Sequence, residues 1–237
     1  TPVDYYSEFL NNDIVRMMVV ETNRNASNVL REIRLNRSSR LKKWYPTNEN
    51  EMKKFIGLLI WMGLAHYPRI TDYWSKNILY KNAVAGQVMS RNRFQLMLRF
   101  WHFNDNNFAE RDGRLYKILP LVTKLNEIFF NKKTASQSLV VDETMIPFRG
   151  RLLMRQYIPN KTHKYGVKVF KLCDKSGYTF HSKIYMGKGT VNNANNDLAS
   201  TSVVMEVMNN HFHKGHILFV DNYYTSVQLA KNLLVRE

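Results

Sequence analysis

The chain has 237 residues, of which 44% are hydrophobic and 13% aromatic, so it can bury a sizeable core and is not a disordered tail. Its formal net charge of +16 favours a polyanionic partner such as nucleic acid, although a generally basic surface that aids solubility would give the same total. The single cysteine, Cys173, excludes an internal disulfide and a cysteine-based zinc site. No apolar run reaches the roughly 18 residues of a membrane span, so none is expected.

Residues 1–135 are predicted to be mainly helical. Asn48, with Glu51 three residues later, is a candidate cap for a helix with apolar residues at helical spacing. Ser90 is expected to cap the helix in "RNRFQLMLRFWHF", and Pro120 is expected in the first turn of the next helix. Four tryptophans have the spacing of core residues, with base stacking as the alternative: Trp44, Trp61, Trp74 and Trp101.

After residue 136 the pattern becomes rich in strands. Residues 138–146, "SLVVDETMI", are predicted to form the first strand. Residues 165–173 and 178–186 read as an antiparallel hairpin, in which Gly177 supplies the turn conformation. The loop 187–197 has glycines, but their spacing does not match a phosphate-binding loop.

The last third of this region is predicted as helix, strand, helix. Asp197 is expected to cap a helix that ends near residue 210. The run "HILFVD" (216–221) is almost uninterruptedly apolar, which favours a central strand covered on both faces. A further helix is expected to begin at Thr225 or Ser226.

Two carboxylates stand at notable positions in these strands. Asp142 lies inside the first predicted strand, and Asp221 ends the strand 216–221. If the two strands are neighbours, their side chains can converge on one spot, as a site for hard Mg²⁺ or Mn²⁺ ions requires. The alternative is that Asp221 is only a turn residue. Glu143 has the opposite parity from Asp142 and is expected to face the other side of the sheet or solvent.

Lysine and arginine are concentrated in two segments. Residues 24–43 hold seven of them against one acid, and residues 149–171 hold seven and no acid. The first segment suits a DNA-contacting helix, a nuclear-import patch or a solvated helix face. Three histidines are expected to lie at the surface or at the start of a strand rather than to bind metal. They are His211, His213 and His216.

Several long motifs resemble the piggyBac transposases and their domesticated relatives. They are "VVDETMIPFRGR", "QYIPNKTHKYGVKVFKLCD", "YMGKGT" and "VDNYYTSVQLAKNLL". The segments "FIGLLIWMGL" and "MSRNRFQLMLRFWHFND" resemble the same family, so the resemblance covers nearly the whole chain.

The resemblance implies an α+β fold with two parts. Residues 1–135 would form a helical dimerisation and DNA-binding domain, and residues 136–237 part of a ribonuclease-H-like mixed β-sheet of the DDE/DDD transposase type. Asp142 and Asp221 would be the first two catalytic carboxylates and ligands of Mg²⁺ or Mn²⁺. The family's third Asp and its cysteine-rich zinc-binding domain would lie beyond residue 237. We therefore expect a fragment that alone supports little or no strand transfer.

The implied function is metal-dependent cleavage of double-stranded DNA at transposon ends, through hairpin intermediates, with strand transfer at TTAA targets. A homodimer in the nucleus is expected to carry it out. The alternative is a domesticated, catalytically inactive protein that binds DNA through its basic segments. Six basic residues are expected to contact DNA phosphates near Asp142: Arg149, Arg151, Arg155, Lys161, Lys164 and Lys168.

Overall fold

The computed structural model describes residues 1–80, 82–107, 113–187 and 198–236. The chain forms two compact units. The first comprises Thr1–Asp112 and Tyr116–Leu121, and the second comprises Gly113–Leu115 and Val122–Glu237. The division falls inside helix α6 (Leu119–Lys132), which carries Pro120 in its first turn as predicted.

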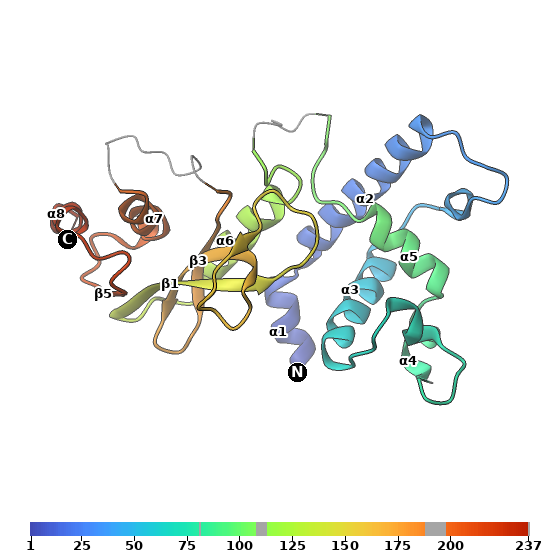
Figure 1. The fold of residues 1–237 in the computed structure, drawn as a ribbon, viewed down its shortest axis with the longest axis horizontal. Helices are drawn as coiled ribbons and strands as arrows, with labels where there is room; N and C mark the ends of the chain where they lie inside the picture. Colours follow the sequence, from blue (N-terminus) through green and yellow to red (C-terminus); the bar gives the residue numbers. More distant parts are fainter. Residues whose placement is uncertain (81, 108–112, 188–197, 237) are drawn as a thin grey trace. The chain divides into compact units, whose positions relative to one another are not determined.

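The first unit is helical (Figure 1). Asn48 accepts a hydrogen bond from the backbone N–H of Glu51, and Ser90 accepts one from Arg93, so both predicted helix caps are confirmed. Its described elements are α1 (Pro2–Phe9), α2 (Asn12–Glu32), η1 (Arg40–Lys43), α3 (Glu49–Leu64), η2 (Ile70–Trp74), α4 (Ala83–Val88) and α5 (Arg91–Phe100).

The four tryptophans belong to the packing of this helical unit. Each ring lies against another aromatic ring, at centroid separations between 4.8 and 5.5 Å. The pairs are Trp44–Phe100, Trp101–Phe55, Trp74–Phe94 and Trp61–Tyr73. The four residues pack against other rings as predicted, but each is half-buried and none belongs to the fully buried core. Within the described parts of the chain, no helix has the length and apolarity needed to cross a membrane.

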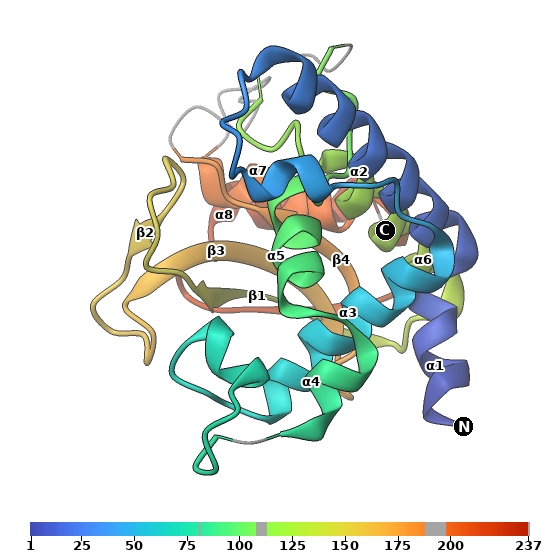
Figure 2. The ribbon, with the colours of Figure 1, turned by 90° about the vertical axis from the view of Figure 1, so that its right-hand side faces the viewer.

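The second unit contains a mixed β-sheet, drawn from two sides in Figures 1 and 2. The strand order is β2-β3-β1-β5, with β4 also paired to β3. β1 runs antiparallel to β3 and parallel to β5, so the α+β class with a mixed sheet is confirmed. The described strands are β1 (Ser138–Pro147), β2 (Gln156–Tyr157), β3 (Tyr165–Asp174), β4 (Thr179–Ile184) and β5 (Ile217–Val220).

Helices cover one face of this sheet. Leu139 and Val141 of β1 alternate with more exposed residues and pack with Phe170 and Leu172 of β3 in one buried cluster. Helices α7 (Ala199–Val207) and α8 (Val227–Leu234) complete this cluster, and Figure 2 shows both on one side of the strands. α6 is fastened to β4 because the Asn126 amide exchanges hydrogen bonds with the backbone of Ser182.

The β3–β4 hairpin forms as predicted, with Gly177 at φ 82° in its turn. The prediction for β5 is wrong in one respect. Within the described chain β5 pairs only with β1, so it is an edge strand, and the side chains of Ile217 and Phe219 remain about half exposed. A long apolar run predicts that a strand is largely buried, but it does not determine how many neighbouring strands pair with it.

The helix predicted after residue 197 is present as α7, which begins at Ala199 after Leu198 as its N-cap. The predicted cap, Asp197, lies outside the described residues, as does the predicted loop beyond Gly187. At the last helix, Ser226 accepts a hydrogen bond from the backbone N–H of Leu229, so Ser226 rather than Thr225 caps α8.

Candidate active site

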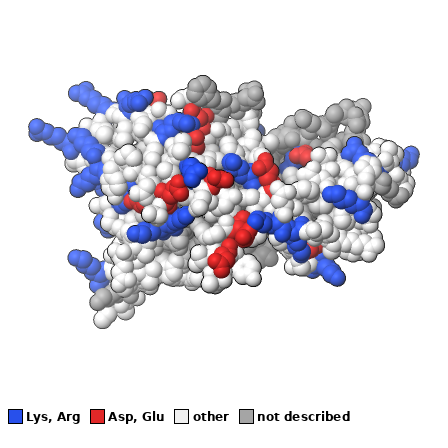
Figure 3. Space-filling view, turned by 180° about the vertical axis from the view of Figure 1, so that it is seen from behind, with Lys and Arg blue, Asp and Glu red and all other residues white. Residues whose placement is uncertain are grey.

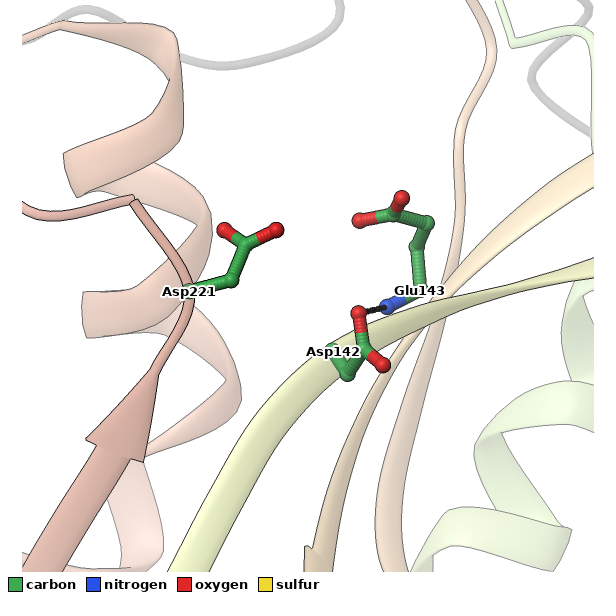
Figure 4. Close-up of side chains that lie close together, drawn as sticks. All are labelled: Asp142, Glu143 and Asp221. Atoms are coloured by element: carbon green, nitrogen blue, oxygen red, sulfur yellow. Dashed lines mark hydrogen bonds between the residues drawn. The ribbon is translucent and has the colours of Figure 1, made fainter. Parts of the chain in front are cut away.

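Asp142 and Asp221 meet because two parallel strands are in register. The last paired residues of β1 and β5 are Val141 and Val220, and an aspartate follows each of them directly. The structure thus brings the two sequence-predicted acids to neighbouring positions at the carboxyl end of the parallel pair. Both side chains are exposed (Figure 4).

Glu143 joins them, contrary to the expectation that it faces elsewhere. One oxygen of each of the three carboxylates lies within 4.8 Å of the others. Alternation does place Glu143 on the opposite face of β1 from Asp142, with the buried Leu139 and Val141. Its longer side chain nevertheless extends toward Asp221 (Figure 4). Strand alternation predicted the face of β1 correctly, but it did not predict that the Glu143 carboxylate lies near the aspartates.

Backbone N–H groups hold both aspartates in the same way. Oδ1 of Asp142 accepts from the N–H of Glu143 at 2.7 Å, and Oδ1 of Asp221 accepts from the N–H of Tyr223 at 2.9 Å. Each carboxylate is therefore oriented through one oxygen by a backbone N–H group that follows it in the chain.

The Glu143 carboxylate is fixed by a buried tyrosine and a lysine. The Tyr224 hydroxyl donates to Oε2 at 2.8 Å, and Nζ of Lys161 lies 3.1 Å from Oε1. Burial would raise the pKa of Glu143, but the Tyr224 hydroxyl and Lys161 outweigh it, so the pKa lies below its ordinary value. Burial and this same bond raise the pKa of Tyr224 far above its usual range, which keeps its hydroxyl protonated as a donor.

A second lysine approaches Glu143 from β3. Nζ of Lys168 lies 3.9 Å from Oε2 of Glu143 and above the rings of Phe170 and Tyr223. Burial lowers the pKa of Lys168, while Glu143 and the two aspartates act against that shift. At Lys161 the bond to Glu143 dominates and raises the pKa. Three carboxylates and two ammonium groups therefore share one site at this end of the sheet.

The other predicted DNA contacts lie further along the same stretch of chain. Arg149 and Arg151 are exposed between β1 and β2, and Lys164 is exposed just before β3. Arg155 donates from Nη1 to the backbone oxygens of Arg149 and Gly150, which ties this loop together. The structure therefore brings Lys161 and Lys168 to the acids, whereas the other four are exposed residues for which it shows no contact with the acids.

The basic segment 24–43 is only partly helical, since α2 ends at Glu32 and η1 begins at Arg40. Arg24 pairs with Glu21 and Asp105, so part of its charge is neutralised. Figure 3 shows Lys and Arg side chains spread over one face with Asp and Glu side chains among them. Charge density alone does not outline a binding surface on that face.

One of the three histidines differs from the sequence prediction, since His213 is exposed and His216 directly precedes β5 as expected. His211 is buried, with 4% of its surface exposed, so the expectation of a surface or strand-start position was wrong for it. Its ring packs against Phe130 and Phe180, and lies 5.9 Å from the ring of His216. The 3-10 helix η3 (Asn209–His211) turns His211 inward. An irregular turn lacks the periodicity from which burial is predicted, so no sequence pattern marked this residue.

A family model described as Transposase IS4 matches residues 1–237. The curated Homo sapiens protein named PiggyBac transposable element-derived protein 3 is 25% identical over 236 residues, which cover 98% of this chain and 38% of that protein. The Homo sapiens PiggyBac transposable element-derived protein 5 is 25% identical over 191 residues, which cover 79% of this chain and 35% of that protein.

Among solved structures, the chain is similar to one described as the cryo-EM structure of piggyBac transposase synaptic complex with hairpin DNA. The TM-score is 0.80 and the sequence identity 27%, over 98% of this chain and 48% of that one. The chain therefore spans less than half the length of the proteins that it resembles here.

Proposed function

The chain belongs to the Transposase IS4 family, and within it to the piggyBac-type transposases, and from this premise we propose that it carries the first part of a metal-dependent DNA-cleaving site. The observation that carries the proposal is the convergence of Asp142 and Asp221 at the end of two parallel strands. Membership of the family does not determine whether a given protein still cuts DNA, whereas the presence of both carboxylates bears on it directly.

The residues at this end of the sheet fit a hard divalent ion. All three acids offer carboxylate oxygens, which are the ligands that Mg²⁺ and Mn²⁺ prefer. Asp142 and Asp221 are exposed, and a carboxylate oxygen that accepts one hydrogen bond keeps a lone pair for a cation, so we assign both residues as ligands. When bound, such an ion would stabilise negative charge on a scissile phosphate.

Glu143 has a different task, because both of its oxygens already accept from protein groups. Oε1 faces Lys161 and Oε2 takes the Tyr224 hydroxyl. We assign Glu143 as a positioning residue that holds the Lys161 ammonium beside the aspartates. In this position the Lys161 ammonium can donate a hydrogen bond to a phosphate oxygen of DNA, and Lys168 adds a second positive charge.

The exposed arginines extend this surface along the loop after β1. We propose that Arg149, Arg151, Arg155 and Lys164 contact backbone phosphates and position the duplex without reading its bases. The structural relative is described as a synaptic complex with hairpin DNA, which supports hairpin intermediates for this protein too. Action at TTAA targets, as a homodimer in the nucleus, is the corresponding proposal for the whole protein.

A second candidate function is DNA binding without cleavage. The names of the human relatives describe them as transposable element-derived proteins, which favours a domesticated role. The presence of both aspartates favours an enzyme, because a protein that only binds DNA has no need to keep two exposed acids near bound phosphates.

A plasmid excision assay with the full-length protein separates the two functions. In a cutting enzyme, Asp142→Asn and Asp221→Asn should each lower excision by at least about a thousandfold, or roughly 4 kcal/mol of barrier. Asp13→Asn, an exposed acid on α2, is the matched control and should leave excision unchanged. Full excision by both active-site variants would sink the proposal, while salt-sensitive DNA binding without any excision would support the second function.

A further inference from the structure

A pocket of about 490 Å³ lies at the end of the sheet away from the carboxylate cluster. It is lined by the segment 130–135, which ends α6 and leads to β1, and by His211, Lys214 and His216. His216 immediately precedes β5, whereas Asp221 immediately follows it. His216 and Asp221 are five positions apart, which corresponds to about 17 Å along an extended strand.

Three ring nitrogens of the two histidines that line this pocket lack partners. Within the described residues, Nδ1 of His211 and both ring nitrogens of His216 have no hydrogen-bond partner and are covered in this structure, so each ring has to turn before a ligand in the pocket can reach them. An imidazole keeps at least one N–H at any ordinary pH, so His216 holds at least one buried donor without an acceptor. Such a group costs roughly 1–3 kcal/mol unless something in the pocket accepts its hydrogen bond.

The charge around these rings is positive. Lys132, Lys133 and Lys214 line the pocket, and among its described lining residues none is acidic. Lys133 forms an ion pair with Asp174. Among the described residues, no acidic partner is seen for Lys214, whose Nζ donates a hydrogen bond of 2.6 Å to the backbone oxygen of Asn210.

The titration of His211 reflects the same surroundings. Burial, and to a smaller extent the nearby Lys214, His216 and His181, together lower its pKa to about 4. A pocket of this kind is unfavourable for a metal cation, and the described residues supply no third ligand beside the two imidazoles.

We propose that this pocket binds a phosphate group. A phosphate offers acceptor oxygens in several directions, which suits donors that approach from the η3 turn, the start of β5 and the end of α6. A planar carboxylate would reach fewer of these donors at once. The negative charge of the phosphate would also be compensated by Lys214 and Lys132. The group can belong to a free phosphate or to the backbone of a nucleic acid.

The pocket does not depend on the proposed cleavage. It shares no residue with the carboxylate cluster, and it requires no divalent ion. A failure of cleavage in the Asp142 and Asp221 variants would leave it untouched, and a failure to bind phosphate here would leave the cleavage proposal untouched.

Histidine resonances in NMR spectra, recorded while inorganic phosphate is added, test the proposal. In the wild-type chain, phosphate should move the signals of His211 and His216 and raise the pKa of His211, because an anion favours the protonated ring. Lys214→Gln should weaken the apparent affinity at least about tenfold, or 1.4 kcal/mol. Lys231→Gln removes an equally exposed charge from α8 and should behave like the wild type.

His216→Phe provides an independent measurement through stability. It removes both buried nitrogens, so the phosphate-dependent rise in melting temperature should disappear, while that of Lys231→Gln persists. Shifts no larger than those caused by chloride at equal ionic strength would overturn the proposal. Equal responses of the wild type and Lys214→Gln would overturn it as well.

A short DNA duplex then identifies the source of the phosphate. If the duplex moves the His211 and His216 signals and free phosphate competes with it, the pocket takes a backbone phosphate. If only free phosphate moves them, the pocket takes a small phosphorylated ligand. If neither moves them, water fills the pocket and the proposal is wrong.

Discussion

The two ends of β5 differ in charge and in the way that the sequence builds them. At its carboxyl end, Asp221 joins Asp142 and Glu143 in an acidic cluster. At its amino end, His216 joins His211 and three lysines in a basic pocket. Regular pairing of two strands places the acids, whereas an irregular turn and a helix end place the basic groups.

This difference shows how one short strand can serve two kinds of chemistry. The two aspartates stand where the pairing of β1 with β5 ends, are exposed and are oriented by backbone N–H groups, which leaves them accessible to a cation. His211 stands behind aromatic rings, and its burial together with the neighbouring lysine charge lowers its pKa, so this end of β5 favours an anion rather than a cation. Changes at one end of β5 should therefore leave the other end intact.

The largest effect after loss of an aspartate is expected at Glu143. Glu143→Ala frees Lys161 and removes the acceptor of the buried Tyr224 hydroxyl. DNA cleavage by the full-length protein should fall about 10- to 100-fold, as for partners that orient the ligands of a metal site.

The control is Glu143→Gln, which keeps an acceptor for the Tyr224 hydroxyl but loses the ion pair to Lys161. It should retain the wild-type stability and lose only the part of the rate that depends on the lysine. Unchanged single-turnover rates for both Glu143 variants would show that Glu143 does not position Lys161 for cleavage.

Gly166→Ala tests the strand contact that supports the lysines of the acidic end. A Cβ at this position would lie 2.3 Å from the backbone oxygen of Ile146 on β1, and backbone atoms cannot move aside cheaply. The free energy of unfolding should fall by up to about 3 kcal/mol in urea denaturation. The resonances of His211 should keep their positions, since they report the other end of the sheet.

Gly57→Ala is the matched control for this change. A Cβ at Gly57, on α3, would meet nothing within 4 Å, so the substitution should stabilise its helix by about 0.5–1 kcal/mol. If Gly166→Ala were also neutral or stabilising, the close approach of β1 and β3 at that point would be refuted.

The basic end should make stability depend on pH. Because the pKa of His211 is about 4 when folded and about 6.5 in the free side chain, the unfolded state binds more protons between these values. Stability should therefore be highest above about pH 6.5 and fall as the pH drops to 4. The loss is about 2 kcal/mol at most, because the pocket opens to solvent.

Asp174 adds a further decline at lower pH. Burial would raise its pKa, but bonds from Lys133 and Ser176 outweigh it and lower the pKa to about 2. Its contribution, about 1 kcal/mol after solvent screening, should be lost from about pH 4 to pH 2. In urea titrations at several pH values, His211→Phe should remove the first decline and Asp174→Asn the second. A His211→Phe curve parallel to the wild type would contradict the buried neutral ring.

The smallest effect is expected for a single phosphate contact at the acidic end. Arg151→Gln should reduce the slope of log K against log salt by about 0.9 for duplex DNA. Arg16→Gln, an exposed arginine paired with Glu49 in the helical unit, is the control. Equal slopes for wild type and Arg151→Gln would remove Arg151 from the DNA surface.

Much of the second unit could be predicted from residue patterns. The alternation in "SLVVDETMI" and the turn residues before Gly177 predicted β1 and the β3–β4 hairpin. The apolar run before Asp221 predicted a strand, and the idea that it neighbours β1 led directly to the convergence of Asp142 and Asp221. Helix caps at Asn48 and Ser90 were predictable because their hydrogen bonds are local.

What could not be predicted depends on contacts between distant residues. Glu143 was assigned to the wrong surroundings because parity describes where Cβ points, not how far a glutamate reaches. The bond from Tyr224 to Glu143 joins residues 81 positions apart, and nothing in either local sequence indicates it. The burial of His211 depends on Phe130 and Phe180, which belong to other elements.

Binding of Mn²⁺ to the chain, followed by electron paramagnetic resonance, tests the central claim most directly, because it needs neither DNA nor turnover. The wild-type chain should bind the ion, and Asp142→Asn and Asp221→Asn should each weaken its affinity at least about tenfold, or 1.4 kcal/mol. Asp13→Asn should match the wild type. If both active-site variants bound Mn²⁺ as tightly as the wild type, Asp142 and Asp221 would not form a metal site.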